Sequence, residues 1–275
     1  MSPVKETNFM EHAPLEFDEA AEPATPQFDA KGRRKLLTIH DYKSLFEGVR
    51  DEVAIGEASP NYLFHHERTV QTIQKYVPNT KLIAILRNPV DRAYSDYLMH
   101  VREVIGEPKP LAIQLEQKAE TSYTLLKGKY YEGIKHFLDV FGSEQVKVFL
   151  YDDLSTDSVA FMRDIYNFIG VDSSFDVNTK QRKQMAEVPK FQTINQLLRT
   201  ENPIRIAARS LLRKVLSEEK RQQLRSRLIA VNSQGKESMP LSAEDRQLLE
   251  TYYREDVQQL QDLIGQDLSR WFDLS

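Results

Sequence analysis

The chain has 275 residues, of which 40% are hydrophobic and 28% charged, so it fits one large folded domain or two small ones rather than a disordered or fibrous chain. It has no cysteine, which excludes disulfides, thiolate metal sites and cysteine nucleophiles. No apolar run approaches the ~20 residues of a membrane span, and the formal net charge of −4 does not favour nucleic-acid binding. We therefore expect a cytoplasmic protein without a membrane span or a nucleic-acid partner.

Two segments have a strong charge bias. Between Glu11 and Asp29 there are six acids, no Lys or Arg, and three prolines that interrupt any helix, which predicts an exposed loop. From Arg199 to Arg227 there are nine basic residues against three Glu, with apolar residues interleaved at helical spacing. This second segment is either a solvated helix face or a surface that meets an anionic partner.

Short apolar runs alternate with helical patterns along the middle of the chain. The runs Val53–Ile55, Leu82–Leu86 and Val146–Tyr151 predict three buried strands of a parallel sheet. Beyond about Lys190 no further strand pattern occurs, so the last third is expected to be helical. The predicted helices are Tyr62–Tyr76, Val90–Val104, Lys129–Val140, Ser158–Ile169 and Ala243–Leu263, the last with Ser242 as N-cap and Asp245 three residues later.

The segment from Lys81 to Ser95 combines the features of an anion site. Its strand ends just before Arg87, at the carboxyl edge of the sheet where α/β proteins place ligands, and Pro89 then opens a helix. Ser95 follows about two helical turns after the strand. The guanidinium and the hydroxyl would converge on one phosphate, unless Arg87 instead pairs with a carboxylate at the strand end.

Several stretches match one family in order and spacing. Leu86-Arg-Asn-Pro-Val-Asp-Arg-Ala-Tyr-Ser95 resembles the 3′-phosphate-binding segment of sulfotransferases that use 3′-phosphoadenosine 5′-phosphosulfate (PAPS), particularly bacterial members related to the heparan-sulfate sulfotransferases. Further matching stretches are Ser2-Pro-Val-Lys-Glu-Thr-Asn-Phe9, Gly56-Glu-Ala-Ser-Pro-Asn-Tyr-Leu63, Tyr130-Tyr131, Val148-Phe-Leu-Tyr-Asp-Asp-Leu154 and Asp267-Leu-Ser-Arg-Trp271.

The resemblance implies a fold and roles for three residues. The fold is α/β and P-loop-NTPase-like, a three-layer parallel sheet with crossover helices, in a single domain over residues 1–275. Within it we expect a loop-rich segment 1–45, an α/β core 46–190 and a helical part 191–275. The resemblance further implies that Arg87 and Ser95 bind the 3′-phosphate and that Glu6 is the catalytic base. The alternative for Glu6 is a surface residue paired with Lys5. Lys5 either adds positive charge near the sulfate or is a solvated side chain near the terminus.

The chain also departs from the family pattern. Family members begin with a strand, a phosphate-binding loop and a helix that hold the 5′-phosphosulfate, and Met1 falls just after that unit. No Gly-x-x-x-x-Gly-Lys-Ser/Thr pattern occurs elsewhere. Gln184-Met185-Ala186 stands where the family usually has Asn-x-Ser. We therefore expect a chain truncated at its N-terminus, with negligible activity until an upstream strand, loop and helix are restored.

The sequence shows no metal-binding pattern, so no metal is expected, and His12, His65 and His66 are alternative bases or surface residues. The first hypothesis is transfer of a sulfuryl group from PAPS to a hydroxyl of a glycan or small metabolite. The second is a noncatalytic remnant or interaction module that keeps the 3′-phosphate half-site. Neither the acceptor nor the oligomeric state follows from the sequence.

Overall fold

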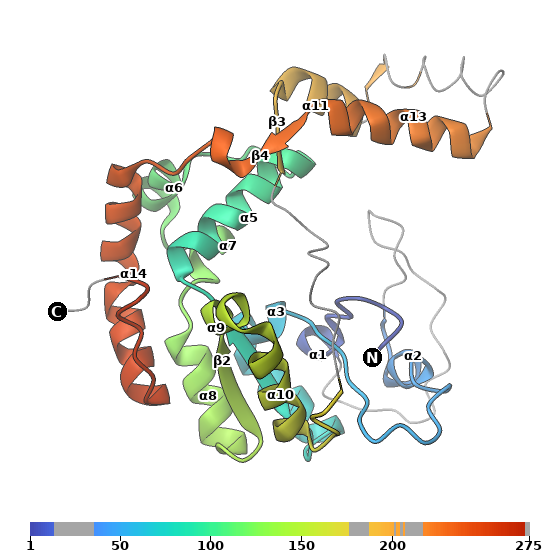
Figure 1. The fold of residues 1–275 in the computed structure, drawn as a ribbon, viewed down its shortest axis with the longest axis vertical. Coiled ribbons are helices and arrows are strands. Elements are labelled where there is room, and N and C mark those ends of the chain that lie inside the picture. Colours follow the sequence, from blue (N-terminus) through green and yellow to red (C-terminus); the bar gives the residue numbers. More distant parts are fainter. Residues whose placement is uncertain (14–35, 176–186, 201, 204–205, 207–216, 273–275) are drawn as a thin grey trace. The chain divides into compact units, whose positions relative to one another are not determined.

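The computed structural model of the chain describes residues 1–13, 36–175, 187–200, 202–203, 206 and 217–272. These residues form two compact units, whose elements Figure 1 labels in chain order. Unit 1 comprises Met1–Arg87, Lys129–Thr179 and Glu255–Ser275, and unit 2 comprises Asn88–Gly128 and Lys180–Arg254. The assignment of residues 1–275 to a single domain stays a prediction.

Unit 1 contains a parallel sheet of two strands, β1 (Leu82–Leu86) and β2 (Val146–Leu150). Their register pairs Leu82 with Val146 and Leu86 with Leu150. The remaining elements of this unit are α1 (Phe9–His12), α2 (Ile39–Ser44), α3 (Asn61–Phe64), α4 (His66–Tyr76), α8 (Tyr131–Phe141), α9 (Tyr151–Thr156), α10 (Ser158–Ile169) and the end of α14 (Ala243–Ile264).

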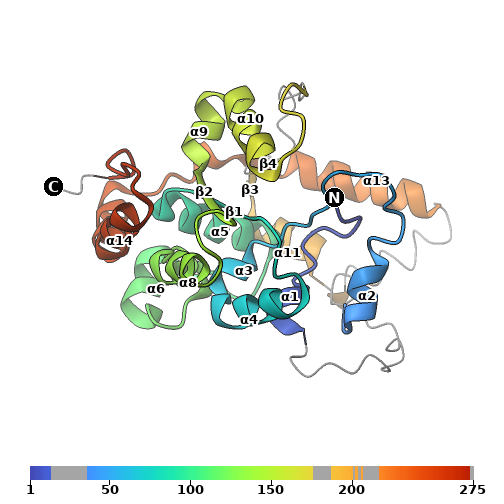
Figure 2. The same cartoon turned by 90° about the horizontal axis from the view of Figure 1, so that it is seen from below.

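Helices lie on both sides of this sheet. Figure 2 shows α4 and α8 on one side of β1 and β2, and α9 and α10 on the other. Val70 of α4, Phe137 of α8 and Val146 of β2 belong to one buried cluster, and on the opposite side Phe161 of α10 meets the Phe149 ring edge-on at 5.3 Å. The two strands thus lie between helices in an α/β arrangement, as the sequence predicts. The prediction of a buried strand is confirmed for most of β2 but is wrong for much of β1, because Ile83 and Ile85 are 39% and 46% exposed.

One of the three predicted strands is wrong. Val53–Ile55 forms no strand, and the side chains of Val53 and Ile55 are 83% and 55% exposed. Three apolar residues become a strand only when a neighbouring strand satisfies their backbone groups, and β1 pairs only with β2 among the described strands. The described parallel sheet is therefore smaller than the sequence suggests.

The other predictions for unit 1 need two corrections, one to a helix and one to the end of a strand. The predicted helix Tyr62–Tyr76 is interrupted at His65, whose ψ of 37° separates α3 from α4. Tyr151 begins α9 rather than ending the strand β2. By contrast α10 spans Ser158–Ile169 as predicted; Asp157 caps its first turn, and Gly170, with φ of 76°, ends it in the left-handed region that glycine tolerates.

Unit 2 is mainly helical. Its longest complete helix, α5, begins as predicted at Pro89, because the side chain of Asn88 accepts hydrogen bonds from the amides of Val90 and Asp91. Helix α14 also begins at the predicted cap, where Ser242 accepts from the Asp245 amide at 3.0 Å. The other elements are α6 (Leu111–Lys118), α7 (Tyr123–Leu126), β3 (Glu187–Pro189), α11 (Gln192–Arg199), α13 (Glu218–Val231), β4 (Ser233–Gly235) and a 3₁₀ turn (Lys236–Ser238).

The expectation of no strand beyond Lys190 is wrong, because β3 and β4 form a short antiparallel pair. Strand β4 has the sequence Ser-Gln-Gly, which lacks branched apolar residues and gives no strand signal. Its position depends on a distant contact: Asn232 exchanges side-chain hydrogen bonds with the backbone of Phe191, at 3.0 and 3.1 Å.

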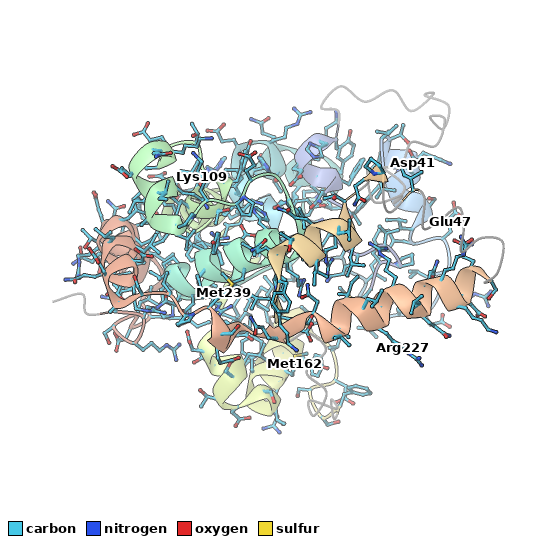
Figure 3. The ribbon with its side chains drawn as sticks, turned by 90° about the horizontal axis from the view of Figure 1, so that it is seen from above. Asp41, Glu47, Lys109, Met162, Arg227 and Met239 are labelled. Atoms are coloured by element: carbon cyan, nitrogen blue, oxygen red, sulfur yellow. The ribbon has the colours of Figure 1, made fainter. Side chains whose placement is uncertain are left out.

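The two charge-biased segments are described only in part. The predicted acidic loop falls mostly on residues 14–35, which lie outside the described residues, as do residues 207–216 of the basic segment. The rest of the basic segment includes most of α13, where no residue is buried, and Figure 3 shows Arg227 extending outward from this helix. Among the described helices, none is long and apolar enough to cross a membrane.

Candidate functional site

Arg87 directly follows β1 in unit 1, at the carboxyl edge of the sheet, as predicted. Its guanidinium lies over the ring of Tyr151, the first residue after β2, at 5.3 Å from the ring centre. Within the described residues the guanidinium has no carboxylate partner, so the alternative of a structural ion pair finds no support there. A cation held on an aromatic face keeps its donors available to an anion.

The backbone at Arg87 is held in place from a neighbouring helix. The Tyr130 hydroxyl donates to the Arg87 carbonyl at 3.0 Å, and the Tyr130 amide donates to the Asp256 carboxylate at 2.8 Å. Burial raises the pKa of Asp256 to about 6, although the amides of Tyr130 and Tyr131 oppose this rise by donating to the carboxylate. Asp256 and Tyr130 therefore fix the strand end that carries Arg87.

The C-terminal segment holds the helix on which Tyr151 lies. The indole of Trp271 donates to Asp152 at 2.8 Å, and Arg270 pairs with Asp153 at 2.7 Å, where the Asp153 carboxylate raises the arginine's pKa. Trp271 also meets the Tyr130 ring edge-on at 6.3 Å. Residues 148–154 and 267–271, two separate stretches of the family resemblance, thus contact each other next to Arg87.

Ser95 lies on α5 in unit 2, about two turns from the helix start, and is half-buried. Arg87 and Ser95 belong to different units, so the structure describes each within its own surroundings. Beside Ser95 in sequence, Tyr94 and Tyr97 line a hollow of about 210 Å³ together with Met239 and Leu241. Burial raises the pKa of both tyrosines.

Lys5 and Glu6 lie next to each other in unit 1, with the ammonium 3.6 Å from the carboxylate, which is the pairing that the alternative for Glu6 predicts. Their side chains are 79% and 39% exposed, so both are accessible. Glu6 has a positive φ of 55°. This left-handed conformation is unusual for a residue other than Gly, Asn or Asp, and no sequence pattern indicates it.

Hydrogen bonds to Glu57 hold the segment around Glu6. The carboxylate of Glu57 accepts from the hydroxyls of Thr7 at 2.9 Å, Ser59 at 2.8 Å and Tyr62 at 2.5 Å. This stretch is part of the family resemblance, but the sequence does not predict a role for Glu57. The signal that could have indicated a polar cluster is the gathering of Glu57, Ser59 and Tyr62 within six residues.

The three histidines considered as bases have different surroundings. His12 pairs with Glu11 at 2.9 Å, and His65 packs edge-on against Phe64. His66 contacts His136 through their Nδ1 atoms at 3.0 Å, and burial together with this second imidazole lowers the pKa of His66. In the part of the chain that the structure describes, no group of three or more His, Asp or Glu side chains is placed to hold a metal ion.

Comparison with known proteins places this geometry in a family. The model of the sulfotransferase domain matches residues 26–234, well over half of the chain. The crystal structure of a sulfotransferase from Alicyclobacillus acidocaldarius superposes with a TM-score of 0.65 and 28% identity, over 98% of this chain and 87% of that one. The chain therefore belongs to the sulfotransferase family and has its P-loop-like α/β fold.

Distant similarity extends to enzymes named for heparan sulfate. Human heparan sulfate glucosamine 3-O-sulfotransferase 6 is 27% identical over 134 residues, 47% of this chain and 39% of that protein. Mouse bifunctional heparan sulfate N-deacetylase/N-sulfotransferase 4 is 26% identical over 230 residues, 78% of this chain and 23% of that protein. The chain thus spans less than half the length of both relatives.

Proposed function

We propose that this chain is the core of a PAPS-dependent sulfotransferase that transfers a sulfuryl group to a hydroxyl of a glycan or small metabolite. The observation that carries the proposal is the match to the sulfotransferase domain over residues 26–234, within which Arg87 ends a strand at the ligand edge of the sheet. Because its guanidinium has no acidic partner among the described residues, it suits a phosphate.

The proposed roles follow the predicted site residues. Arg87 and Ser95 bind the 3′-phosphate of the nucleotide, and Glu6 is the base that accepts the proton of the acceptor hydroxyl. As the bond between sulfur and the phosphate oxygen breaks, a bond forms between sulfur and the acceptor oxygen. Lys5 offsets negative charge near the sulfuryl group, so catalysis depends on positioning and on charge stabilisation.

The phosphosulfate end of PAPS needs a binding element of its own. The 275 residues contain no Gly-x-x-x-x-Gly-Lys-Ser/Thr pattern that would hold it. We therefore propose that a strand, loop and helix outside these residues complete the three-layer sheet and the active enzyme. Negligible turnover of PAPS by the 275 residues alone, and clear turnover once such a unit precedes them, would support this proposal.

The alternative function is a noncatalytic binding module. One observation favours it: α13 has no buried residue, and its Leu224 and Leu228 are 41% and 47% exposed, as in a helix that contacts a partner.

The experiment that tests the proposal uses two measurements. Calorimetry with adenosine 3′,5′-bisphosphate and the 275-residue chain should show saturable binding. Transfer of ³⁵S from labelled PAPS to a panel of glycan and small-molecule hydroxyls should then occur with the chain joined to a phosphosulfate-binding unit. Nucleotide binding without transfer by the joined protein would favour the module, and absence of both would contradict the proposed function.

A further inference from the structure

The backbone of the N-terminal segment changes its direction twice around Thr7. Glu6 has φ of 55° and Asn8 has φ of 50°, and with Val104 they are the described non-glycine residues in the left-handed region. Asn adopts this conformation readily, whereas Glu does so rarely. A residue that adopts a disfavoured conformation needs surrounding contacts that hold it there.

Those contacts come from residues 56–62. The Ser2 amide donates to the Gly56 carbonyl at 2.8 Å, the Asn8 amide to the Ser59 hydroxyl at 3.0 Å, and the Met10 amide to the Tyr62 hydroxyl at 3.1 Å. Between these amides, Thr7 donates to Glu57 and lies 3.0 Å from the Tyr62 hydroxyl. The segment that contains Glu6 is thus fastened before and after it.

Glu57 organises these contacts. Its carboxylate accepts three hydroxyl hydrogen bonds, and bonds to an ionised acceptor are stronger than bonds between neutral groups. Burial and the charge of Glu57 raise the pKa of Tyr62 above its ordinary value, so its hydroxyl stays protonated as a donor. Ser59 and Tyr62 can then use their oxygens to accept the backbone amides of Asn8 and Met10.

Anchoring of helix α1 does not by itself account for this arrangement. Phe9 and Met10 are already 1% and 2% exposed, and the ring of Phe9 stacks on Tyr42 at 4.7 Å. The apolar core therefore holds α1, whereas the bonds of Glu57 act on the residues that precede it. Glu6 lies within this hydrogen-bonded segment, and its side chain is 39% exposed to solvent.

We propose that Glu57, through Thr7, Ser59 and Tyr62, is a positioning residue that holds Glu6 in its left-handed conformation and so fixes the direction in which the Glu6 carboxylate leaves the chain. The proposal deepens the proposed function and rests on Glu6 being the base. Glu57 touches neither the nucleotide nor the acceptor in this scheme; it acts through the backbone.

Limited proteolysis tests the holding of the segment in the 275-residue chain without any reference to activity. Lys5 is a trypsin site with a 79% exposed side chain, and its cleavage requires the Lys5–Glu6 backbone to leave its fixed conformation. Thr7→Val and Tyr62→Phe each remove one hydroxyl and keep the shape. We expect each to raise the rate of cleavage after Lys5 at least fivefold relative to the other trypsin sites. Glu47→Ala, at an exposed glutamate after α2, is the matched control and should change nothing.

Kinetics of the chain joined to a phosphosulfate-binding unit then test the link to Glu6. Thr7→Val should lower kcat about tenfold with KM for PAPS nearly unchanged, and the same substitution in a Glu6→Gln background should change kcat less than twofold. If both single changes lower kcat and their effects multiply, or if cleavage after Lys5 is unchanged, the positioning role is overturned and the base assignment stands. If Glu6→Gln leaves kcat unchanged, the base assignment fails, and the positioning role fails with it.

Discussion

Arg87 directly follows a five-residue strand whose residues pair in register with β2, whereas Glu6 lies in an irregular segment in which it and Asn8 both have left-handed backbone conformations. At Arg87, regular hydrogen bonding of the sheet sets the position of the preceding strand, and Tyr130 supports its end. At Glu6, side chains from residues 57–62 hold the segment. The comparison shows two ways in which one unit fixes a polar group: repetition of a backbone pattern, and contacts from a distant part of the sequence.

The largest expected effect tests the irregular segment. In the chain joined to a phosphosulfate-binding unit, Glu6→Gln keeps the shape of the side chain and removes its ability to accept a proton. A general base contributes about 10² to 10⁴ in rate, so we expect kcat to fall by that range, measured with labelled PAPS. The affinity for adenosine 3′,5′-bisphosphate should barely change. A kcat within about threefold of the parent would transfer the role to His12 or to no side chain at all.

A second test concerns the support of the regular strand end. The pKa of Asp256 is raised from 3.8 to about 6, so the folded state favours the neutral carboxyl, and this contribution to stability is lost as the pH rises from about 4 through 6. Asp256→Asn does not titrate. The free energy of unfolding of this variant, relative to the parent, should therefore rise between pH 4 and pH 7 by on the order of 3 kcal/mol, as measured by urea unfolding.

The control for this pH test is Asp267, an exposed carboxylate whose pKa is lowered by hydrogen bonds from Ser269. Its contribution has the opposite sign, because it is present at neutral pH and lost as the pH falls through the lowered pKa. Asp267→Asn should therefore not reproduce the rise seen for Asp256→Asn. Parallel pH profiles for the parent and Asp256→Asn would contradict the raised pKa.

A third test addresses the side chain at the strand end. Arg87→Ala removes a charge-assisted contact worth about 1.5 to 3 kcal/mol, so the affinity for adenosine 3′,5′-bisphosphate should fall roughly ten- to a hundredfold in calorimetry. Arg92→Ala is not a suitable control, because Arg92 donates to the Thr124 carbonyl within unit 2. Lys75→Ala, on an exposed position of α4, should leave the affinity unchanged. Equal affinities of the parent and Arg87→Ala would rule out the assignment.

The smallest expected effect is at Ser95. A neutral hydroxyl typically contributes about 0.5 to 1.5 kcal/mol through a hydrogen bond, so Ser95→Ala should weaken binding of the same nucleotide about two- to tenfold. The midpoint of thermal unfolding should be the same for the variant and the parent, since Ser95 is only half-buried. A loss as large as that of Arg87→Ala would mean that Ser95 does more than donate one hydrogen bond.

The regular region could be predicted from the sequence because each of its signals is local. Leu82–Leu86 is a continuous apolar run, Pro89 fixes the start of α5, and Ser158–Ile169 is bounded by a capping Asp and a Gly. The position of Arg87 at the strand end follows from these signals. Its contact with Tyr151 and the fastening of Tyr130 by Asp256 do not, since Asp256 is 126 residues away along the chain.

The irregular region could not be predicted because the contacts that determine it are not local in the sequence. No local sequence pattern predicts the left-handed conformation of Glu6, because the side chains that hold this segment, Glu57 and Tyr62, lie 50 and 55 residues away from Thr7. The wrong strand at Val53–Ile55 and the missed strand β4 follow this rule as well: both depend on whether a distant segment supplies a hydrogen-bonding neighbour. The role of Glu6 therefore stays a prediction, although its unusual backbone is now described.

The exposed face of β1 has a practical consequence for work with the isolated chain. Ile83 and Ile85 are 39% and 46% exposed, and β1 pairs along one edge only among the described strands. An open strand edge with apolar side chains is a template for cross-chain pairing, and salts such as sulfate strengthen apolar association. Ammonium sulfate precipitation and high protein concentration should therefore be avoided during purification, and light scattering should be checked before any calorimetric titration.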